Sequence, residues 1–162
     1  GKIKKVVVTP DHKWVVSMGE KDIAELWALP SLACVGQLTG HLAPLVDILA
    51  VENDLVVTIT EAVDHTLRLW RLSTAQCLYE LRTGSYFTAL TATPFQHQFL
   101  FTGGDDAITL WDAHRRETVA RFVGESPVLS GAISSSGRRL MIGEVSGGIH
   151  LLEITGMPDD AF

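Results

Sequence analysis

Three side chains in the first half of the sequence have the types found in a hydrolytic relay: a hydroxyl, an imidazole and a carboxylate. They are Thr60, His41 and Asp64. In such a relay the imidazole takes the proton of the hydroxyl nucleophile, and the carboxylate orients the imidazole. All three residues, however, fall at places that a repeating sequence pattern assigns, so the pattern accounts for them without catalysis. We therefore expect a structural hydrogen-bond network and no enzyme.

Metal and cofactor motifs are not predicted either. Asp105 and Asp106 are adjacent carboxylates, but they follow two glycines and precede a strand-like segment, which is typical of a tight hairpin turn. The sequence contains no P-loop and no dinucleotide-binding glycine motif. The other histidines do not have metalloprotease spacing; they are His12, His65, His97, His114 and His150. We expect no metal and no cofactor.

The composition limits the class of partner. The 162 residues carry a formal net charge of −6 and are 46% hydrophobic. Contact with phosphate requires clustered Lys and Arg, and the only basic cluster is the small one formed by Lys2, Lys4 and Lys5. The sequence has no run of 18 consecutive apolar residues, about the length that is needed to cross a bilayer. We expect no nucleic-acid partner and no membrane partner.

The two cysteines, Cys34 and Cys77, are 43 residues apart. This separation equals a repeat step, so they should occupy the same site in neighbouring repeats, too far apart for a disulfide. We expect two small fillers in outer strands, in a protein of the reducing cytoplasm.

The elements that carry these residues follow a regular spacing. Trp27, Trp70 and Trp111 are separated by 43 and 41 residues, and a fourth similar segment is centred on Leu152. A period of about 40–45 residues is typical of propeller blades. We expect an all-β chain of repeats at about 1–38, 39–81, 82–122 and 123–155, with a tail at 156–162.

One repeat shows what each blade should contain. Apolar and alternating segments in the second repeat predict strands at 45–51, 55–60, 66–72 and 76–82. Polar residues between these segments favour turns. Four short antiparallel strands in about 40 residues make one propeller blade.

The chain resembles WD-repeat proteins over essentially its whole length. The resemblance rests on Gly40-His41 at the head of a repeat, on Asp64 and Asp105 six residues before their tryptophans, and on the dipeptide Trp111-Asp112. It implies a buried hydrogen-bond network within a repeat. Its members here would be His41, Thr60, Asp64 and Trp70, together with Thr102, Asp105 and Trp111 in the third repeat.

The resemblance also implies how these members are connected. Thr60 would accept the Trp70 N–H and bond His41, which would in turn bond Asp64. The first and fourth repeats depart from the pattern at Lys21, Ser146 and Leu152, so they should lack the full network.

A partner would bind the narrow face that this family presents around its channel. Residues just before and at the start of each inner strand line it in such propellers. Mapped onto this sequence, they are Lys2, Lys4, Pro44, Val46, Tyr86, Thr88, Pro127 and Leu129. Apolar and aromatic anchors with a basic fringe suit a protein partner.

The repeats account for about 3.75 blades, because the fourth lacks an outer strand. WD-repeat propellers usually have seven or so blades, so we expect part of a larger propeller, completed by further blades, a separate subunit or self-association. The leading hypothesis is a non-catalytic scaffold in a regulatory protein. The alternatives are a reader of short or modified peptides, and an autoinhibitory or ligand-sensing propeller of a nucleotide-switch defence or cell-death regulator.

Overall fold

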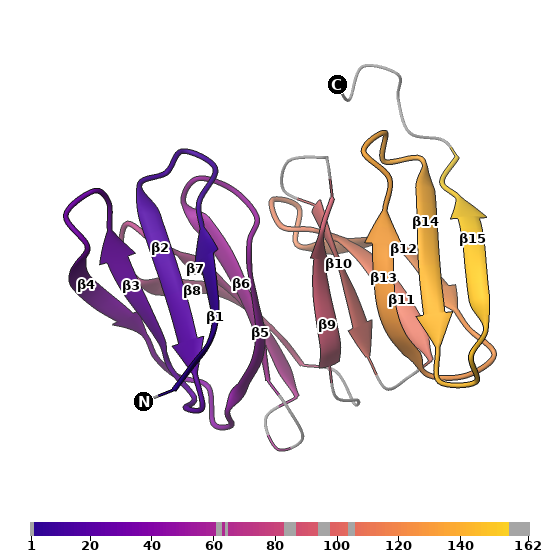
Figure 1. Ribbon diagram of the computed structural model, residues 1–162, viewed down its shortest axis with the longest axis horizontal. Coiled ribbons are helices and arrows are strands. Elements are labelled where there is room, and N and C mark those ends of the chain that lie inside the picture. Colours follow the sequence, from indigo (N-terminus) through magenta and orange to yellow (C-terminus); the bar gives the residue numbers. More distant parts are fainter. Residues whose placement is uncertain are drawn as a thin grey trace. The chain divides into compact units, whose positions relative to one another are not determined.

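The computed structural model describes residues 2–60, 63, 65–82, 87–93, 98–103 and 106–155 (Figure 1). Within these ranges every regular element is a β-strand, and fifteen strands form four separate sheets in sequence order. The described part contains no helix long and apolar enough to span a bilayer. The predicted all-β fold of antiparallel blades is confirmed.

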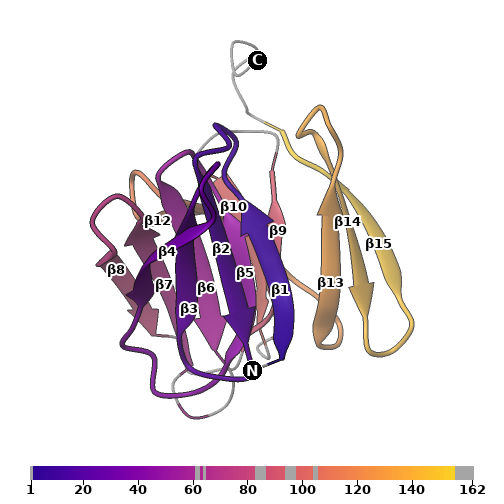
Figure 2. The ribbon, with the colours of Figure 1, turned by 60° about the vertical axis from the view of Figure 1, so that its left-hand side comes forward.

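Each sheet is a meander of consecutive strands. The first sheet contains β1 (Ile3–Val8), β2 (Trp14–Gly19), β3 (Ala24–Ala28) and β4 (Ala33–Leu38). The second contains β5 (Leu45–Ala50), β6 (Leu55–Thr60), β7 (Thr66–Arg71) and β8 (Gln76–Arg82). The third contains β9 (Phe87–Ala92), β10 (Gln98–Gly103), β11 (Ala107–Asp112) and β12 (Glu117–Val123). The fourth has three strands, with β15 at its edge (Figure 2): β13 (Val128–Ile133), β14 (Arg139–Glu144) and β15 (Ile149–Glu153).

The tryptophans occupy equivalent places in the three complete sheets. The register between the third and fourth strands shifts immediately before each of them, at Trp27, Trp70 and Trp111. Beyond the shift, Trp27 stands opposite Cys34 and Trp70 opposite Cys77, so the two cysteines are equivalent, as predicted. Both thiols are free and exposed, not fillers, because the outer strand borders solvent.

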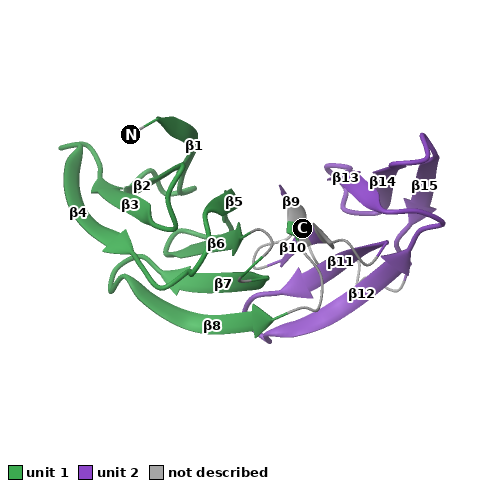
Figure 3. Cartoon of the chain, turned by 90° about the horizontal axis from the view of Figure 1, so that it is seen from below, with its two compact units in different colours: residues 1–87 green, residues 88–162 purple. Residues whose placement is uncertain are grey.

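The described chain divides into two compact units, residues 1–87 and 88–162 (Figure 3). In unit 1 the first and second sheets pack face to face. Side chains alternate between the faces of a strand, so Val16 and Met18 of β2 enter this core while Val15 and Ser17 lie on the opposite face. We call that opposite face the outer face of the first sheet. The second sheet contributes Leu45, Ile48, Val56, Trp70 and Leu72 to the core.

In unit 2 the third and fourth sheets share a smaller core. Its buried members are Ile108, Leu110, Val128, Leu140 and Ile142. The alternate residues of β14 and β15 leave apolar side chains on the opposite face of the fourth sheet. Met141, Ile149 and Leu151 are 51%, 73% and 63% exposed there. We call these three residues the open face of the fourth sheet.

Candidate functional site

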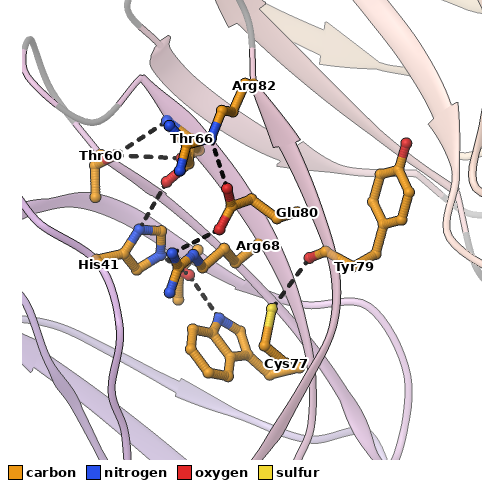
Figure 4. A network of polar contacts seen from close by, with 10 residues as sticks. His41, Thr60, Thr66, Arg68, Cys77, Tyr79, Glu80 and Arg82 are labelled. Atoms are coloured by element: carbon orange, nitrogen blue, oxygen red, sulfur yellow. Dashed lines mark hydrogen bonds and ion pairs between the residues drawn. The ribbon is translucent and has the colours of Figure 1, made fainter.

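A buried chain of hydrogen bonds surrounds His41, which precedes β5 (Figure 4). His41 is 3% exposed. Its Nε2 lies 2.7 Å from Thr58 Oγ1 in β6, and its Nδ1 lies 3.0 Å from Thr66 Oγ1 in β7. Trp70 Nε1 donates to the same Thr58 hydroxyl over 2.8 Å. With the proton on Nδ1, the hydrogen bonds run from Trp70 through Thr58 and His41 to Thr66, and every member is satisfied.

The sequence assigned the acceptor of the Trp70 N–H to Thr60, and this assignment is wrong. Thr60 Oγ1 donates to the Thr66 carbonyl and accepts from the Thr66 N–H, each over 3.3 Å. The sheet register gives the reason. Val56 stands opposite Trp70, Thr58 is the next residue on that face, and Thr60 lies two residues further on. The indole reaches its diagonal neighbour in the sheet but not the residue beyond it.

Three predicted members of the networks lie outside the described part of the chain: all of Asp64 and Asp105, and the side chain of Thr102. Their roles stay predictions. In the third sheet Trp111 is buried and its ring lies 5.5 Å from that of Phe99. The register places Phe101 where Thr58 stands in the second sheet. The third sheet therefore brings an aromatic ring, not a hydroxyl, to this place.

The first sheet contains a network member that sequence reasoning missed. Trp27 Nε1 donates to Ser17 Oγ over 2.9 Å. Ser17 lies two residues beyond the partner of Trp27 in β2, as Thr58 does relative to Trp70. The signal in the sequence was a hydroxyl residue at the same position of the second strand in two repeats, Ser17 and Thr58. That position can be recognised only after the strands are paired.

Arg68 extends the polar network of the second sheet toward its outer strand. It is 9% exposed, and its Nη2 lies 2.6 Å from Glu80 Oε2. Arg82 Nε donates to the other oxygen of Glu80 over 2.7 Å. The hydrogen bond from Arg82, aided by the charge of Arg68 and opposed by burial, holds the pKa of Glu80 below its ordinary value. The Arg68 guanidinium also lies 5.9 Å from the Trp70 ring.

A second polar cluster, which the sequence did not predict, surrounds Glu144 at the end of β14. The Glu144 side chain is 1% exposed. It accepts hydrogen bonds from the Glu125 N–H over 3.0 Å, and from Ser126 Oγ and Ser146 Oγ over 3.2 Å each. His150 Nε2 lies 3.2 Å from Oε1, the oxygen that also accepts from the Glu125 N–H, while the two serines bond Oε2. Burial raises the pKa of Glu144, but these hydrogen bonds outweigh burial and hold the pKa below its ordinary value.

The register shows which residues of the second sheet correspond to this cluster. Thr60 and Glu144 are equivalent, because each stands opposite the first residue of its inner strand. Gly124 and Glu125 follow Trp111 by 13 and 14 residues, as Gly40 and His41 follow Trp27, so Gly124 corresponds to Gly40 and Glu125 to His41. A Cβ on Gly124 would lie 2.2 Å from Glu144 Oε1. The Glu144 carboxylate therefore lies against this loop, where the Glu125 N–H donates to it.

The residues predicted to meet a partner are only partly described. In unit 1, Lys2, Lys4 and Pro44 are exposed and Val46 is half-buried. Their strands β1 and β5 are in contact, and Lys5 pairs there with Asp47. In unit 2 Leu129 is exposed and Pro127 half-buried. Tyr86 and the side chain of Thr88 lie outside the described residues. Partner binding at these residues stays a prediction.

An apolar cavity of about 300 Å³ lies in unit 2 beside the edge strand β15. Its apolar wall comes from β11, β12, β14 and the segment around β15, with Leu110, Ala120, Phe122, Leu140, Leu152 and Ile154. Each of the other sheets has a fourth strand where the fourth sheet ends at β15. Among the described residues no strand pairs with the free edge of β15, which lies beside this apolar cavity.

The polar groups of these clusters are engaged in hydrogen bonds within their own sheets. Thr60, the predicted nucleophile, has its hydroxyl bonded to the backbone of Thr66. Both ring nitrogens of His41 are engaged. No group of three His, Cys, Asp or Glu side chains could hold a metal within the part of the chain that the structure describes. Hydrogen-bond networks in which every member has a partner fix the geometry of their sheets.

Comparison with known proteins finds similarity over part of the chain. No protein-family model matches it. It is 34% identical over 86 residues to "Ribosome biogenesis protein YTM1" of Phaeosphaeria nodorum, covering 52% of this chain and 18% of that protein. It is 30% identical over 92 residues to the protein of the same name from Pyrenophora tritici-repentis, covering 56% and 20%.

A third relative is "Cilia- and flagella-associated protein 52" of Chlamydomonas reinhardtii, which is 25% identical over 118 residues, covering 72% of this chain and 19% of that protein. The chain spans about a fifth of the length of the curated relatives it matches. Together with the four sheets, these partial similarities support the resemblance to WD-repeat proteins.

Proposed function

We propose that the chain is a non-catalytic platform that binds other proteins, or further blades of a propeller, through the open face of its fourth sheet. The observation that carries this proposal is the exposure of Met141, Ile149 and Leu151 beside the edge of β15, with which no strand of the described residues pairs. Apolar side chains that are this exposed and this close together mark interaction surfaces. An unpaired strand edge adds backbone groups that can pair with another strand.

The setting of this platform is a larger assembly. Two relatives are named for ribosome biogenesis and one for cilia and flagella, and the shared region is about a fifth of each. That shared region supports a common role in protein assembly more than either of the two named processes. The free, exposed cysteines Cys34 and Cys77 fit a reducing compartment such as the cytoplasm.

Sedimentation velocity of the 162-residue chain tests the open face. Without a partner, the apolar face and the edge should associate with another copy, so the mean sedimentation coefficient should rise with protein concentration. Leu151→Lys should shift the chain toward monomer, because a charge in the middle of the apolar face opposes its burial.

The matched control is Val35→Lys, since Val35 is also an exposed apolar residue on a strand, 53% exposed in β4. This variant should sediment like the parent chain. A parent chain that stays monomeric and melts cooperatively at every concentration would contradict the proposal. Equal effects of the two substitutions would show that the association does not use the open face.

A further inference from the structure

A serine in the loop between the third and fourth sheets lies where several hydrogen bonds meet. Ser126 Oγ lies 3.2 Å from Glu144 Oε2 and 2.9 Å from Ser146 Oγ, and it accepts from the Ser146 N–H over 3.3 Å. The carbonyl of the next residue, Pro127, accepts from the Val145 N–H over 2.9 Å. This loop therefore holds the turn between β14 and β15, and the Ser126 hydroxyl is one of the attachment points.

The residue after Ser126 is a proline, which is the feature that proline-directed protein kinases require in a substrate. Two threonines also precede a proline, Thr9 and Thr93. Thr9 is 1% exposed, so its hydroxyl is closed to an enzyme. Thr93 is half-buried, and its hydroxyl donates to the Gln98 carbonyl over 2.9 Å. Ser126 is half-buried as well, but it faces the exposed turn 145–147, which an enzyme can displace.

A phosphate on this serine would meet a buried carboxylate. The Glu144 side chain is 1% exposed, so little water separates it from its neighbours. Phosphoserine carries a charge of about −1.5 to −2 near neutral pH and has no hydroxyl hydrogen to donate. His150 does not separate the two anions, because it bonds Oε1 of Glu144 while Ser126 approaches Oε2. Repulsion should therefore drive the phosphorylated loop away from Glu144.

We propose that Ser126 is a phosphorylation site for a proline-directed serine/threonine kinase, and that the phosphate releases the loop from the β14–β15 turn. The kinase transfers the γ-phosphoryl group of a nucleoside triphosphate to Ser126 Oγ. The bond from this phosphorus to the nucleoside diphosphate breaks, the Oγ–P bond forms, and the hydroxyl proton passes to the catalytic carboxylate of the kinase. The modification acts within unit 2 and does not depend on what the open face of the fourth sheet binds.

Incubation of the chain with a purified mitogen-activated protein kinase and Mg²⁺-ATP tests the site, with mass spectrometry to locate the phosphate. Phosphate should appear on Ser126 and not on Thr9, whose hydroxyl is buried. Pro127→Ala keeps the serine and should abolish its modification. The inference is overturned if Ser126 of the parent chain stays unmodified, or if Ser126 of the Pro127→Ala variant is modified as fast as in the parent.

Hydrogen–deuterium exchange of the phosphorylated chain tests the release. Exchange of the Val145 and Ser146 amides should become about tenfold faster, since both donate to the loop and amide exchange follows local opening. Exchange in the β1–β2 turn of unit 1 should stay the same. Ser126→Ala removes the hydroxyl without adding charge, so it should accelerate exchange less than phosphorylation does.

The role of charge is tested by Glu144→Gln in the phosphorylated chain. This variant should lose most of the acceleration, because a neutral amide does not repel the phosphate and can donate to it. If Glu144→Gln does not fold, Ser126→Asp and Ser126→Asn provide the comparison, and the charged variant should accelerate exchange more than the neutral one. Unchanged exchange at Ser146 after phosphorylation would overturn the release. Equal acceleration with and without the second charge would overturn repulsion as its cause.

Discussion

Replacing Thr58 by valine removes the hydroxyl at the centre of the hydrogen-bond chain and keeps the branched shape of the side chain. Thr58 is 0% exposed, so water cannot take the place of the hydroxyl without rearrangement. Trp70 Nε1 and His41 Nε2 both lose the partner that lies 2.8 and 2.7 Å away. A buried polar group left unsatisfied costs about 1–3 kcal/mol, so for the two groups the free energy of unfolding should fall by about 2–6 kcal/mol.

The matched control is Thr60→Val, which removes an equally buried hydroxyl from the same strand. Both hydrogen bonds of Thr60 are long, 3.3 Å to the backbone of Thr66, so the loss should be about 1 kcal/mol. Urea unfolding followed by circular dichroism measures both losses, provided that the slope with urea is unchanged. A loss for Thr60→Val as large as that for Thr58→Val would refute the assigned acceptor and restore the arrangement predicted from the sequence.

The same denaturation assay tests glycine conformation. Gly40→Ala should cost about 1–2 kcal/mol more than Gly147→Ala, because both have positive φ, +130° and +86°, but only at Gly40 would a Cβ meet a neighbour, Arg68 Nη1. The pH dependence of the melting temperature tests Glu144, whose pKa is lowered in the fold. Its ionised form should stabilise the fold above the ordinary carboxyl range, and this stabilisation should disappear as the pH falls through the folded-state pKa. Glu144→Gln should therefore flatten the acid side of the curve, while Gln in place of the exposed Glu153 should leave it unchanged.

The sequence was sufficient for the strands because each repeat carries its own local signals. The predicted strands at 45–51, 55–60, 66–72 and 76–82 match β5, β6, β7 and β8 to within one residue at their ends. Tryptophan spacing and polar turns fix where each strand begins and ends along the chain. These signals are local, so a single repeat is enough to read them.

Hydrogen-bond partners were harder to predict because they depend on how strands are paired. Thr58 and Thr60 lie on the same face of β6, and a pattern with a period of two cannot choose between them. The choice follows from the residue that stands opposite Trp70, and the register shift at Leu69/Trp70 helps to set that geometry. The family pattern therefore located the network in the correct repeat but identified the wrong hydroxyl.

The fourth sheet shows a different limit of sequence reasoning. Its departures from the family pattern predicted the lack of the full family network, and the structure has a different polar cluster there, around Glu144. A loop glycine, Gly124, makes room for a strand carboxylate, Glu144. Neither change is informative alone, because a loop glycine and a strand glutamate are each common. Only their contact shows that one depends on the other, since a Cβ on Gly124 would lie 2.2 Å from Glu144 Oε1. In the second and fourth sheets, therefore, a buried strand side chain bonds the loop before the inner strand, but the residues differ: Thr58 bonds His41 in one, and Glu144 bonds the Glu125 N–H in the other.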